Sequence, residues 1–440
     1  MVNWFSTRSN EQAIADVTAL FREHFGQDAQ DNTGPGRSST EPAGVWSAPG
    51  RVNLIGEHVD YAGGICLPFA LSQRTYVAAA LNHDGVYRVV SQFGAENTQV
   101  GAENTQAETI HEEIAIDQVC PGYPDNWAGY VVGTVWAAGL EVPGLDIAIV
   151  SDVPVGAGLS SSAALECSVA LAAADLAADL AADPAAGLSK TSTDRTALMH
   201  AAIRAENEVV GASTGGLDQR IALFAEPGHA LAIDFATDST HQVPFQIADR
   251  GLAVLITNTN APHSLADGQY ASRRAVVDGV TADLQVTSLR YADDAEAASA
   301  RWAEANTPED VDAAAWQEVV GKRVRHIVSE ISRTAEAIEQ LRAGDLAGFG
   351  ESMQASHASL RDDYEVSVAQ LDVSVDVAMQ HGALGARMTG GGFGGSSIAL
   401  LPSEKVEKAA EAIARAFAEA GFAEPEFAVA LPGAGARREA

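Results

Sequence analysis

The sequence has 440 residues, of which 47% are hydrophobic and 20% are charged, so it is long enough for two globular domains and too apolar for a disordered chain. Its 27 lysines and arginines face 59 aspartates and glutamates, and because the formal net charge is −32 we expect neither nucleic acid nor a membrane as a partner. Cys66, Cys120 and Cys167 are widely separated, odd in number and form no Cys-x-x-Cys pair, which argues against a disulfide framework or a structural zinc site. Residues 1–12 lack the apolar core of a secretory signal, so we expect a cytoplasmic protein.

The first half of the chain alternates between predicted strands and helices. Short apolar runs predict strands at residues 45–48, 75–81, 87–90, 145–150 and 231–235. A stretch rich in Ala and Leu predicts a long buried helix from residue 163 to about residue 184, and residues 196–210 form a second predicted helix. Residues 27–44 are typical of a loop, and the tandem copies of GAENTQ within residues 94–106 indicate a loop expansion.

The second half of the chain repeats this mixture of elements. Strands are predicted at residues 253–257 and 397–401, and helices at residues 318–342, 346–360 and 404–420. Strands and helices in both halves favour an α+β fold over one doubly wound sheet. We place the change of domain just before the strand at 253–257, which gives an N-terminal domain of residues 1–248 and a C-terminal domain of residues 249–440.

The first motif with functional potential is GRVNLIGEHVDY at residues 50–61, where polar side chains surround a short apolar centre. Sugars are bound by polar side chains that exchange hydrogen bonds with several hydroxyl groups, and Glu57, His58 and Asp60 can do this. A surface loop with a satisfied Glu-His pair is the alternative for a window of this kind. The density of polar groups, together with the resemblance described below, favours a sugar site.

The second motif is PVGAGLSSSA at residues 154–163, between a predicted strand and a predicted helix. Glycines let the backbone approach an anion, and the free N–H groups of the following helix point at it, so the motif suits phosphate. It lacks the lysine of a Walker loop, so the missing charge has to come from a metal such as Mg²⁺, to which Ser162 could offer a hydroxyl and Glu206 a carboxylate. A simple Gly/Ser turn that caps a helix explains the segment equally well on its own.

Two further segments are rich in glycine. Residues 385–396 (GARMTGGGFGGS) hold five glycines among positions 390–395, and each costs conformational entropy on folding. A flexible linker is the alternative, but the tight flanking sequence favours an ordered loop that passes close to another backbone or a ligand. Residues 211–219 (GASTGGLDQ) place Asp218 where its carboxylate could be aimed into a cleft, although an aspartate that caps a helix is the simpler interpretation of this segment alone.

In this order, the motifs resemble those of the GHMP kinase family and, within it, the galactokinases. The first resembles the galactokinase signature, the second the phosphate-binding motif of the family and the third its glycine-rich C-terminal motif, and residues 258–274 resemble another galactokinase segment. The resemblance spans about residues 45–399. It implies a two-domain α+β fold, with a ribosomal-protein-S5-like N-terminal domain, a ferredoxin-like C-terminal domain and the active site between them.

The resemblance also implies ATP-dependent phosphorylation of the anomeric hydroxyl of D-galactose, which gives galactose 1-phosphate and ADP as the first committed step of galactose use. Asp218 would be the catalytic carboxylate, and Arg51 would stabilise the transferring phosphoryl group and keep Asp218 ionised. The sugar would be held by Glu57, His58, Val59, Asp60, Gly215 and Tyr270. The nucleotide would be held by Ser91, Gly156, Ala157, Gly158, Leu159, Ser160, Ser161 and Ser162. Mg²⁺, which accompanies ATP, would bind Ser162 and Glu206.

One departure from the family pattern leaves the substrate open. Val59 stands where the galactokinase signature usually has Thr, so N-acetylgalactosamine or arabinose are alternatives to galactose. A sugar sensor that binds galactose and ATP without catalysis is an alternative of another class. The intact sequence Ser161-Ser162-Ala163, with Arg51 and Asp218, favours an active kinase, which we expect to be a monomer with galactose and MgATP as partners.

Overall fold

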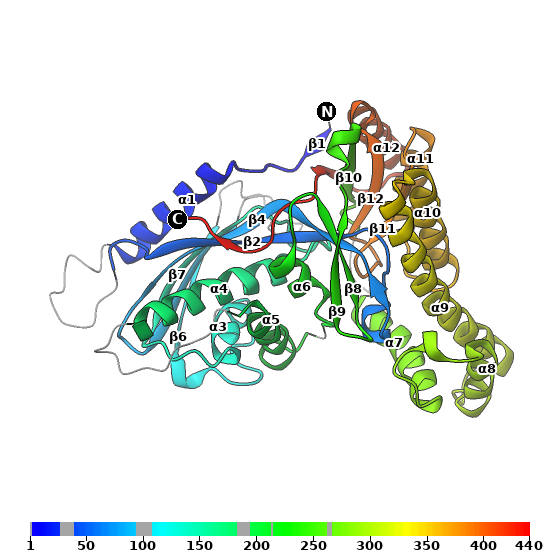
Figure 1. Cartoon of the computed structure of the whole chain (residues 1–440), viewed down its shortest axis with the longest axis horizontal. Coiled ribbons are helices and arrows are strands. Elements are labelled where there is room, and N and C mark those ends of the chain that lie inside the picture. The colour runs from blue at the N-terminus through cyan, green and yellow to red at the C-terminus, as the bar shows by residue number, and fades with distance from the viewer. Residues whose placement is uncertain (1, 27–38, 94–107, 183–193, 213, 262–265) are drawn as a thin grey trace.

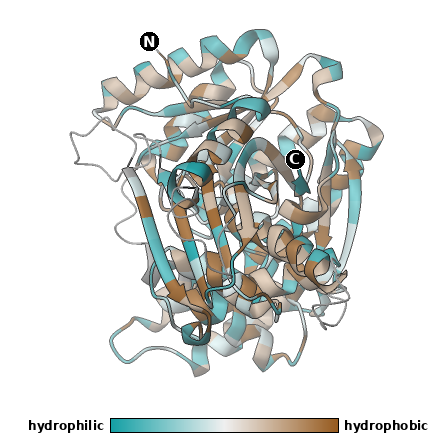
Figure 2. Cartoon of the chain, turned by 90° about the vertical axis from the view of Figure 1, so that its left-hand side faces the viewer, coloured by the Kyte–Doolittle hydropathy of each residue, from teal (hydrophilic) through white to brown (hydrophobic). Residues whose placement is uncertain are grey.

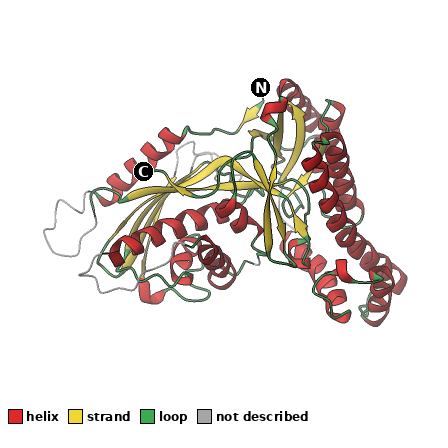
Figure 3. Cartoon of the chain, viewed as in Figure 1, coloured by secondary structure: helices red, strands yellow, loops and turns green. Residues whose placement is uncertain are grey.

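The computed structural model describes residues 2–26, 39–93, 108–182, 194–212, 214–261 and 266–440. Most of the predicted loop at 27–44, the duplicated segment at 94–106 and the end of the predicted helix beyond residue 182 lie outside these residues. Helices and strands are mixed in both halves of the chain, as predicted, and long helices pack along one end of the molecule (Figure 3). Among the described residues, no helix is both long and apolar enough to cross a membrane.

The N-terminal sheet is built mainly from the first half of the chain. In order across the sheet, its strands are β14 (Arg437–Arg438), β2 (Gly44–Asn53), β4 (Pro68–Leu81), β7 (Leu145–Ser151), β5 (Val86–Phe93) and β6 (Glu108–Ala115). The accompanying helices are α1 (Asn10–Phe25), α3 (Ala128–Ala137), α4 (Ser161–Ala182), α5 (Arg195–Arg204) and α6 (Leu217–Phe224), and α5 continues into a π-helical turn (Ala205–Val210).

Both faces of the N-terminal sheet are covered by helices (Figure 1). Successive side chains of a strand point to opposite faces, and in β4 both sets are apolar. Tyr76 and Ala78 belong to the hydrophobic cluster with α1, whereas Val77 and Ala79 belong to the cluster with α3 and α4. The strands of this sheet accordingly carry many hydrophobic segments in Figure 2, which explains the unbroken apolar run at residues 75–81.

The C-terminal sheet contains, in order, β1 (Asn3–Trp4), β13 (Glu426–Ala430), β10 (Leu252–Asn258), β12 (Ser396–Pro402) and β11 (Gly385–Thr389). A smaller sheet contains β3 (Ile65–Cys66), β8 (His229–Asp234) and β9 (Ser239–Pro244). The helices of the second half are α7 (Ala266–Asp283), α8 (Ala295–Ala305), α9 (Ala313–Ala343), α10 (Leu346–Asp362), α11 (Ala369–Gln380) and α12 (Val406–Ala420).

The strand β10 connects two hydrophobic clusters. Leu255 on one face packs with α11 and α12, whereas Val254 and Ile256 on the other face pack in a cluster that also contains Val52 of β2 and Phe69 of β4. This second cluster joins strands of both sheets, and its fully buried side chains remove apolar area from water on both sides of the junction. The two parts of the chain therefore share one continuous core at their contact.

The ends of the chain cross between the two sheets. Near the N-terminus, β1 pairs in parallel with β13 of the C-terminal sheet, and near the C-terminus β14 pairs with β2 of the N-terminal sheet. The predicted boundary between residues 248 and 249 lies in the short helical turn before β10. The division of the chain at this point stays a prediction.

Candidate active site

The three predicted loops meet at one place. The phosphate motif follows β7, and the glycine-rich loop connects β11 to β12. Ser396 Oγ donates a hydrogen bond to the carbonyl oxygen of Ala157 at 2.7 Å, and the backbone N–H of Arg51 donates to the carbonyl of Leu159 at 3.0 Å. A Cβ atom on Gly390 would lie 3.2 Å from the carbonyl oxygen of Gly158, so glycine permits this close approach of two backbones.

Arg51 and Asp218 form a bidentate ion pair. The guanidinium Nε lies 2.7 Å from Asp218 Oδ1 and Nη2 lies 3.0 Å from Oδ2, which is the strong fork geometry of arginine with a carboxylate. Asp218 belongs to the first turn of α6, after Gly216 in the left-handed region at a φ of 86°. Nη1 of Arg51 also donates to the carbonyl of Gly158 at 2.5 Å, so Arg51 joins the predicted catalytic carboxylate to the phosphate motif.

The predicted metal ligands Ser162 and Glu206 are neighbours. Ser162 Oγ, at the start of α4, donates to Glu206 Oε1 at 3.2 Å. Burial, together with the negative charge of Asp218, raises the pKa of Glu206 to about 7, and burial raises the pKa of Glu166 well above its usual range. A divalent cation would offset this concentration of carboxylates, and a hydroxyl with a carboxylate is a ligand pair that Mg²⁺ accepts.

The protein alone provides few ligands for a metal ion at Ser162 and Glu206. Among the described residues, no group of three or more His, Cys, Asp and Glu side chains could hold a metal ion. Mg²⁺ is commonly held by one or two protein ligands together with water and substrate phosphates, so Ser162 and Glu206 fit an ion that arrives with a nucleotide.

Glu57 lies at the contact between the sugar motif and the glycine-rich loop. Its Oε1 atom accepts a hydrogen bond from the backbone N–H of Gly390 at 2.8 Å and another from Thr389 Oγ1 at 3.2 Å. Nη1 of Arg387, a fully buried side chain on β11, lies 3.7 Å from the same oxygen. One oxygen of Glu57 thus fixes the position of the carboxylate relative to the glycine-rich loop.

His58 is held as a neutral imidazole. Burial lowers its pKa to about 3, and the nearby charge of His326 lowers it further. Nε2 lies 3.1 Å from the carbonyl oxygen of Gly391, which can only accept, so Nε2 carries the proton. Nδ1 then accepts a hydrogen bond from Tyr61 Oη at 3.3 Å, and this pair of contacts fixes both the ring and its tautomer.

Asp60 and Gly215 are in direct contact. A Cβ atom at Gly215 would overlap Asp60 Oδ2, so a larger residue would displace the carboxylate. Burial, together with the negative charges of Asp218 and Glu57, raises the pKa of Asp60 to about 6. The structure therefore brings Asp60 and Asp218 close enough for their charges to interact.

Three other predicted substrate contacts are Val59, Ser91 and Tyr270. Val59 is fully buried in a hydrophobic cluster with Cys66 and Leu231, where it faces the backbone of Gly64. Ser91 lies on β5 within the N-terminal sheet, paired with Ile149 of β7. Tyr270 belongs to α7, but its side chain lies outside the described part of the structure. The roles of these three residues, like those of the other predicted site residues, stay predictions.

Two residues of α9 support the sugar motif, although no sequence motif predicts this role for them. Nε2 of the fully buried His326 lies 3.2 Å from the carbonyl oxygen of Glu57. Glu330 Oε1 accepts from the backbone N–H of Gly56 at 3.0 Å and from Ser356 Oγ at 2.6 Å. A signal existed in the sequence: Arg323, His326, Glu330 and Thr334 recur at helical spacing on the face of α9 that also carries buried Val320, Val324, Ile327 and Ile331.

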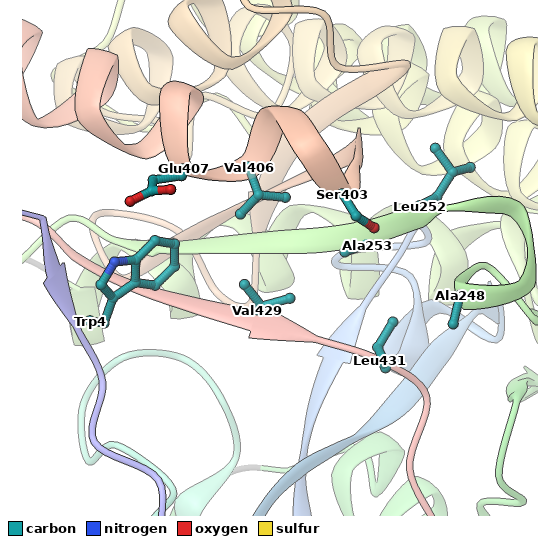
Figure 4. Close-up of a pocket in the computed structure, with 9 residues that line it drawn as sticks. All are labelled: Trp4, Ala248, Leu252, Ala253, Ser403, Val406, Glu407, Val429 and Leu431. Carbon is teal, nitrogen blue, oxygen red and sulfur yellow. The ribbon is translucent and has the colours of Figure 1, made fainter.

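An apolar groove lies elsewhere in the molecule (Figure 4). It has a volume of about 450 Å³ and is lined by side chains that include Trp4, Leu252, Val406 and Val429. None of the predicted site residues belongs to it. The candidate active site is therefore defined by the meeting of the three motifs and not by this groove.

Three family models match separate parts of the chain. They are "Galactokinase galactose-binding signature" at residues 19–81, "GHMP kinases N terminal domain" at 129–226 and "GHMP kinases C terminal" at 337–419. A galactokinase from Streptomyces coelicolor is 41% identical over 434 residues, which cover 97% of this chain and 99% of that protein. The chain belongs to the galactokinase family. A human member of the family is 38% identical over 398 residues, which cover 89% of this chain and 88% of the human protein.

Solved structures agree with this family. A galactokinase from Lactococcus lactis, crystallised with galactose, is 32% identical with a TM-score of 0.76, and the alignment covers 97% of this chain and 99% of that chain. A mevalonate kinase, 15% identical with a TM-score of 0.56 over 90% of this chain and 98% of that chain, shares the fold. The predicted fold class, α+β with N- and C-terminal GHMP kinase domains, is confirmed, and the chain is a kinase enzyme.

Proposed function

We propose that this galactokinase family member transfers the terminal phosphoryl group of ATP to the anomeric hydroxyl of D-galactose, giving galactose 1-phosphate and ADP. The observation that carries the proposal is the bidentate pair of Arg51 and Asp218 at the point where the sugar motif and the phosphate motif meet. The match to the galactose-binding signature and the likeness to a structure that contains galactose support the choice of sugar.

Asp218 and Arg51 would have different roles in phosphoryl transfer. Asp218 would orient the anomeric hydroxyl and accept its proton as the oxygen–phosphorus bond forms and the bond to ADP breaks. Arg51 would place positive charge beside the transferring phosphoryl group while its contact with Asp218 orients the carboxylate. Phosphoryl transfer demands positioning and charge compensation more than covalent catalysis, and this pair supplies both.

The sugar would be gripped by side chains whose positions are fixed before it binds. Glu57 uses one oxygen for the glycine-rich loop, His58 is held as a single tautomer, and Asp60 is confined against Gly215. Tyr270 is the remaining proposed sugar contact. Val59 is fully buried in a hydrophobic cluster, so its replacement of Thr gives no support to N-acetylgalactosamine as the substrate.

The phosphate motif, residues 156–162, would wrap the phosphates of ATP, with Ser91 as a further nucleotide contact. Ser162 and Glu206 would hold the Mg²⁺ that accompanies the nucleotide. When bound, the ion would supply positive charge to the phosphate oxygens. The chain itself provides little such charge here, because its net charge is −32 and its phosphate motif contains no lysine. We further propose a cytoplasmic monomer, in keeping with the free thiols of Cys66, Cys120 and Cys167.

The test is ADP release with MgATP and a panel of acceptors: galactose, N-acetylgalactosamine, glucose, arabinose, mevalonate and homoserine. We expect turnover with galactose to exceed turnover with every other acceptor by at least about tenfold, since a missing or extra polar group is strongly discriminated in a preorganised polar site. A preference for N-acetylgalactosamine would contradict the proposed substrate. Binding of galactose and ATP without turnover would contradict the proposed catalysis.

A further inference from the structure

A buried group of polar side chains lies next to the phosphate motif. It consists of Glu166 on α4, Glu206 on the π-helical turn and Gln219 on α6, and α4 and α6 lie side by side (Figure 1). Glu166 and Gln219 are fully buried, and Glu206 is only 9% exposed. The proposed reaction gives a role to Glu206 but to neither of the other two.

Gln219 connects the two carboxylates through its side-chain amide. Its Nε2 atom lies 2.6 Å from Glu206 Oε2 and 2.9 Å from Glu166 Oε2. An amide nitrogen has two N–H donors and no acceptor, so the two carboxylates use both of them. In this orientation one N–H of the amide reaches each carboxyl group, so Gln219 links Glu166 to Glu206.

Glu206 is consequently held from two sides. Its Oε2 atom accepts from Gln219, while its Oε1 atom accepts from Ser162 Oγ at 3.2 Å, where the cation is proposed to bind. Residues that orient a metal ligand from behind control its geometry and basicity. Gln219 directly follows Asp218 in the first turn of α6.

The arrangement is costly for folding. Glu166 Oε1 and Gln219 Oε1 are buried and have no hydrogen-bond partner among the described residues. Buried polar groups of this kind lower stability compared with well-packed apolar side chains of the same size. A functional role explains their presence better than a contribution to stability.

We propose that Gln219 is a positioning residue that holds Glu206 toward the Mg²⁺ of the bound nucleotide, and that Glu166 anchors Gln219 in this orientation. The inference rests on the proposed function, because it takes Glu206 as a ligand of that ion. Removal of Gln219 or of Glu166 should therefore weaken the binding of ADP with Mg²⁺ and leave the binding of ADP alone and of galactose unchanged.

The experiment is calorimetric titration of the full chain with ADP, in the presence and absence of Mg²⁺. In Gln219→Met and Glu166→Met we expect the gain in ADP affinity that Mg²⁺ provides to fall by about 10- to 100-fold, the range typical of residues that orient metal ligands. Glu166→Gln is the matched control: it keeps an acceptor oxygen for Gln219 and should retain most of the gain. Galactose binding and the unfolding temperature show that each variant is folded.

Two kinds of result would overturn the inference. A parent-like gain with Mg²⁺ in Gln219→Met would show that Gln219 does not position Glu206. If Gln219→Met fails to fold, Gln219→Asn replaces it. The asparagine amide is one methylene too short to reach both carboxylates. A parent-like gain in ADP affinity with Mg²⁺ in Gln219→Asn would have the same meaning. A parent-like gain in Glu206→Gln would instead overturn the metal role of Glu206, and with it this inference. The proposed reaction is tested separately by turnover of the parent enzyme with galactose.

Discussion

The sugar side and the metal side of the candidate site are supported in different ways. On the sugar side, Gly56 and Glu57 are held by Glu330, His326 and Gly390, which lie 274, 269 and 333 residues away in the chain. On the metal side, the contacts of Glu206 with Ser162 and Gln219 span 44 and 13 residues. These contacts of Glu206 stay within the N-terminal half of the chain, whereas those of Gly56 and Glu57 reach into the C-terminal half.

This difference has consequences for how each side responds to damage. Side chains of the metal side are fixed within the helices of the N-terminal part, so changes there should alter nucleotide binding and leave the contact between the two halves intact. The side chains that join Gly56 and Glu57 to the C-terminal half are fixed across that contact, so changes among them should combine lost galactose binding with lost stability. The following predictions use this contrast, from the largest expected effect to the smallest.

Asp218 lies where the two sides meet, and its loss should have the largest effect. We expect Asp218→Asn to lower kcat by about 10²- to 10⁴-fold, the usual contribution of a positioned general base, because the amide cannot accept the proton. Binding of galactose and of MgADP should persist, since Asn has the same shape. Steady-state kinetics with calorimetric binding measures both, and a kcat within a factor of two of the parent would disprove the catalytic assignment.

Glu330 tests the dependence of the sugar side on the C-terminal half. Although burial opposes it, the charges of His326, Arg387 and Arg333 lower the pKa of this carboxyl, so it is charged and accepts from Gly56 and Ser356. Glu330→Met should cost about 3–5 kcal/mol of stability, as for other broken buried ion pairs, and should raise the KM for galactose.

The control for this prediction is Glu330→Gln, which keeps one acceptor oxygen and should lose less stability in urea unfolding. The KM for MgATP should stay close to that of the parent in both variants. A rise in the KM for MgATP as large as the rise for galactose would contradict the separation of the two sides.

Asp60 gives the sugar side a pH dependence. Its pKa in the folded protein, about 6, exceeds its ordinary value of 3.8, so the folded state binds this proton more tightly than the unfolded state. The stabilising contribution is present below about pH 4 and is lost as the pH rises to about 6. Asp60→Asn should therefore be more stable than the parent at pH 7.

Galactose binding should follow the opposite trend, because the charged carboxylate is the stronger acceptor for sugar hydroxyls. We expect the Kd for galactose to rise by up to about tenfold per pH unit below pH 6, and this slope should disappear in Asp60→Asn. Calorimetry between pH 5 and 8 measures it. An identical slope in the variant would assign the titration to another group.

Val59 should give the smallest effect. Its side chain is fully buried in a hydrophobic cluster, so Val59→Thr adds a hydroxyl to the interior and not to the sugar site. We expect a stability loss of about 1–2 kcal/mol and a ratio of kcat/KM for galactose over N-acetylgalactosamine within about threefold of the parent. A tenfold change in that ratio would show that position 59 selects the sugar.

Much of the fold and the site could be predicted from sequence because the information is local. The strands β4 and β7, the helices α9, α10 and α12 and the three loops are each encoded by contiguous patterns. No helix is predicted at α1, whose first residues are polar, although Ser9 and Gln12 form a capping box at its start.

What could not be predicted depends on the approach of distant segments. His326 and Glu330 belong to an ordinary amphipathic helix until the fold brings them against the sugar motif. The contact of Glu57 Oε1 with the glycine-rich loop, and the burial of Val59, likewise follow from packing across the two halves. The π-helical turn that carries Glu206 was predicted as plain helix, because composition does not distinguish the two.

The most direct test of the central claim is phosphorus NMR of a reaction with galactose and MgATP, run in parallel on the parent and on Asp218→Asn. We predict that a sugar 1-phosphate resonance grows in the parent as the terminal phosphate signal of ATP declines, and that its rate falls by about 10²-fold or more in the variant. Equal rates in the two proteins, or a phosphate that appears on another hydroxyl of the sugar, would contradict the proposed site.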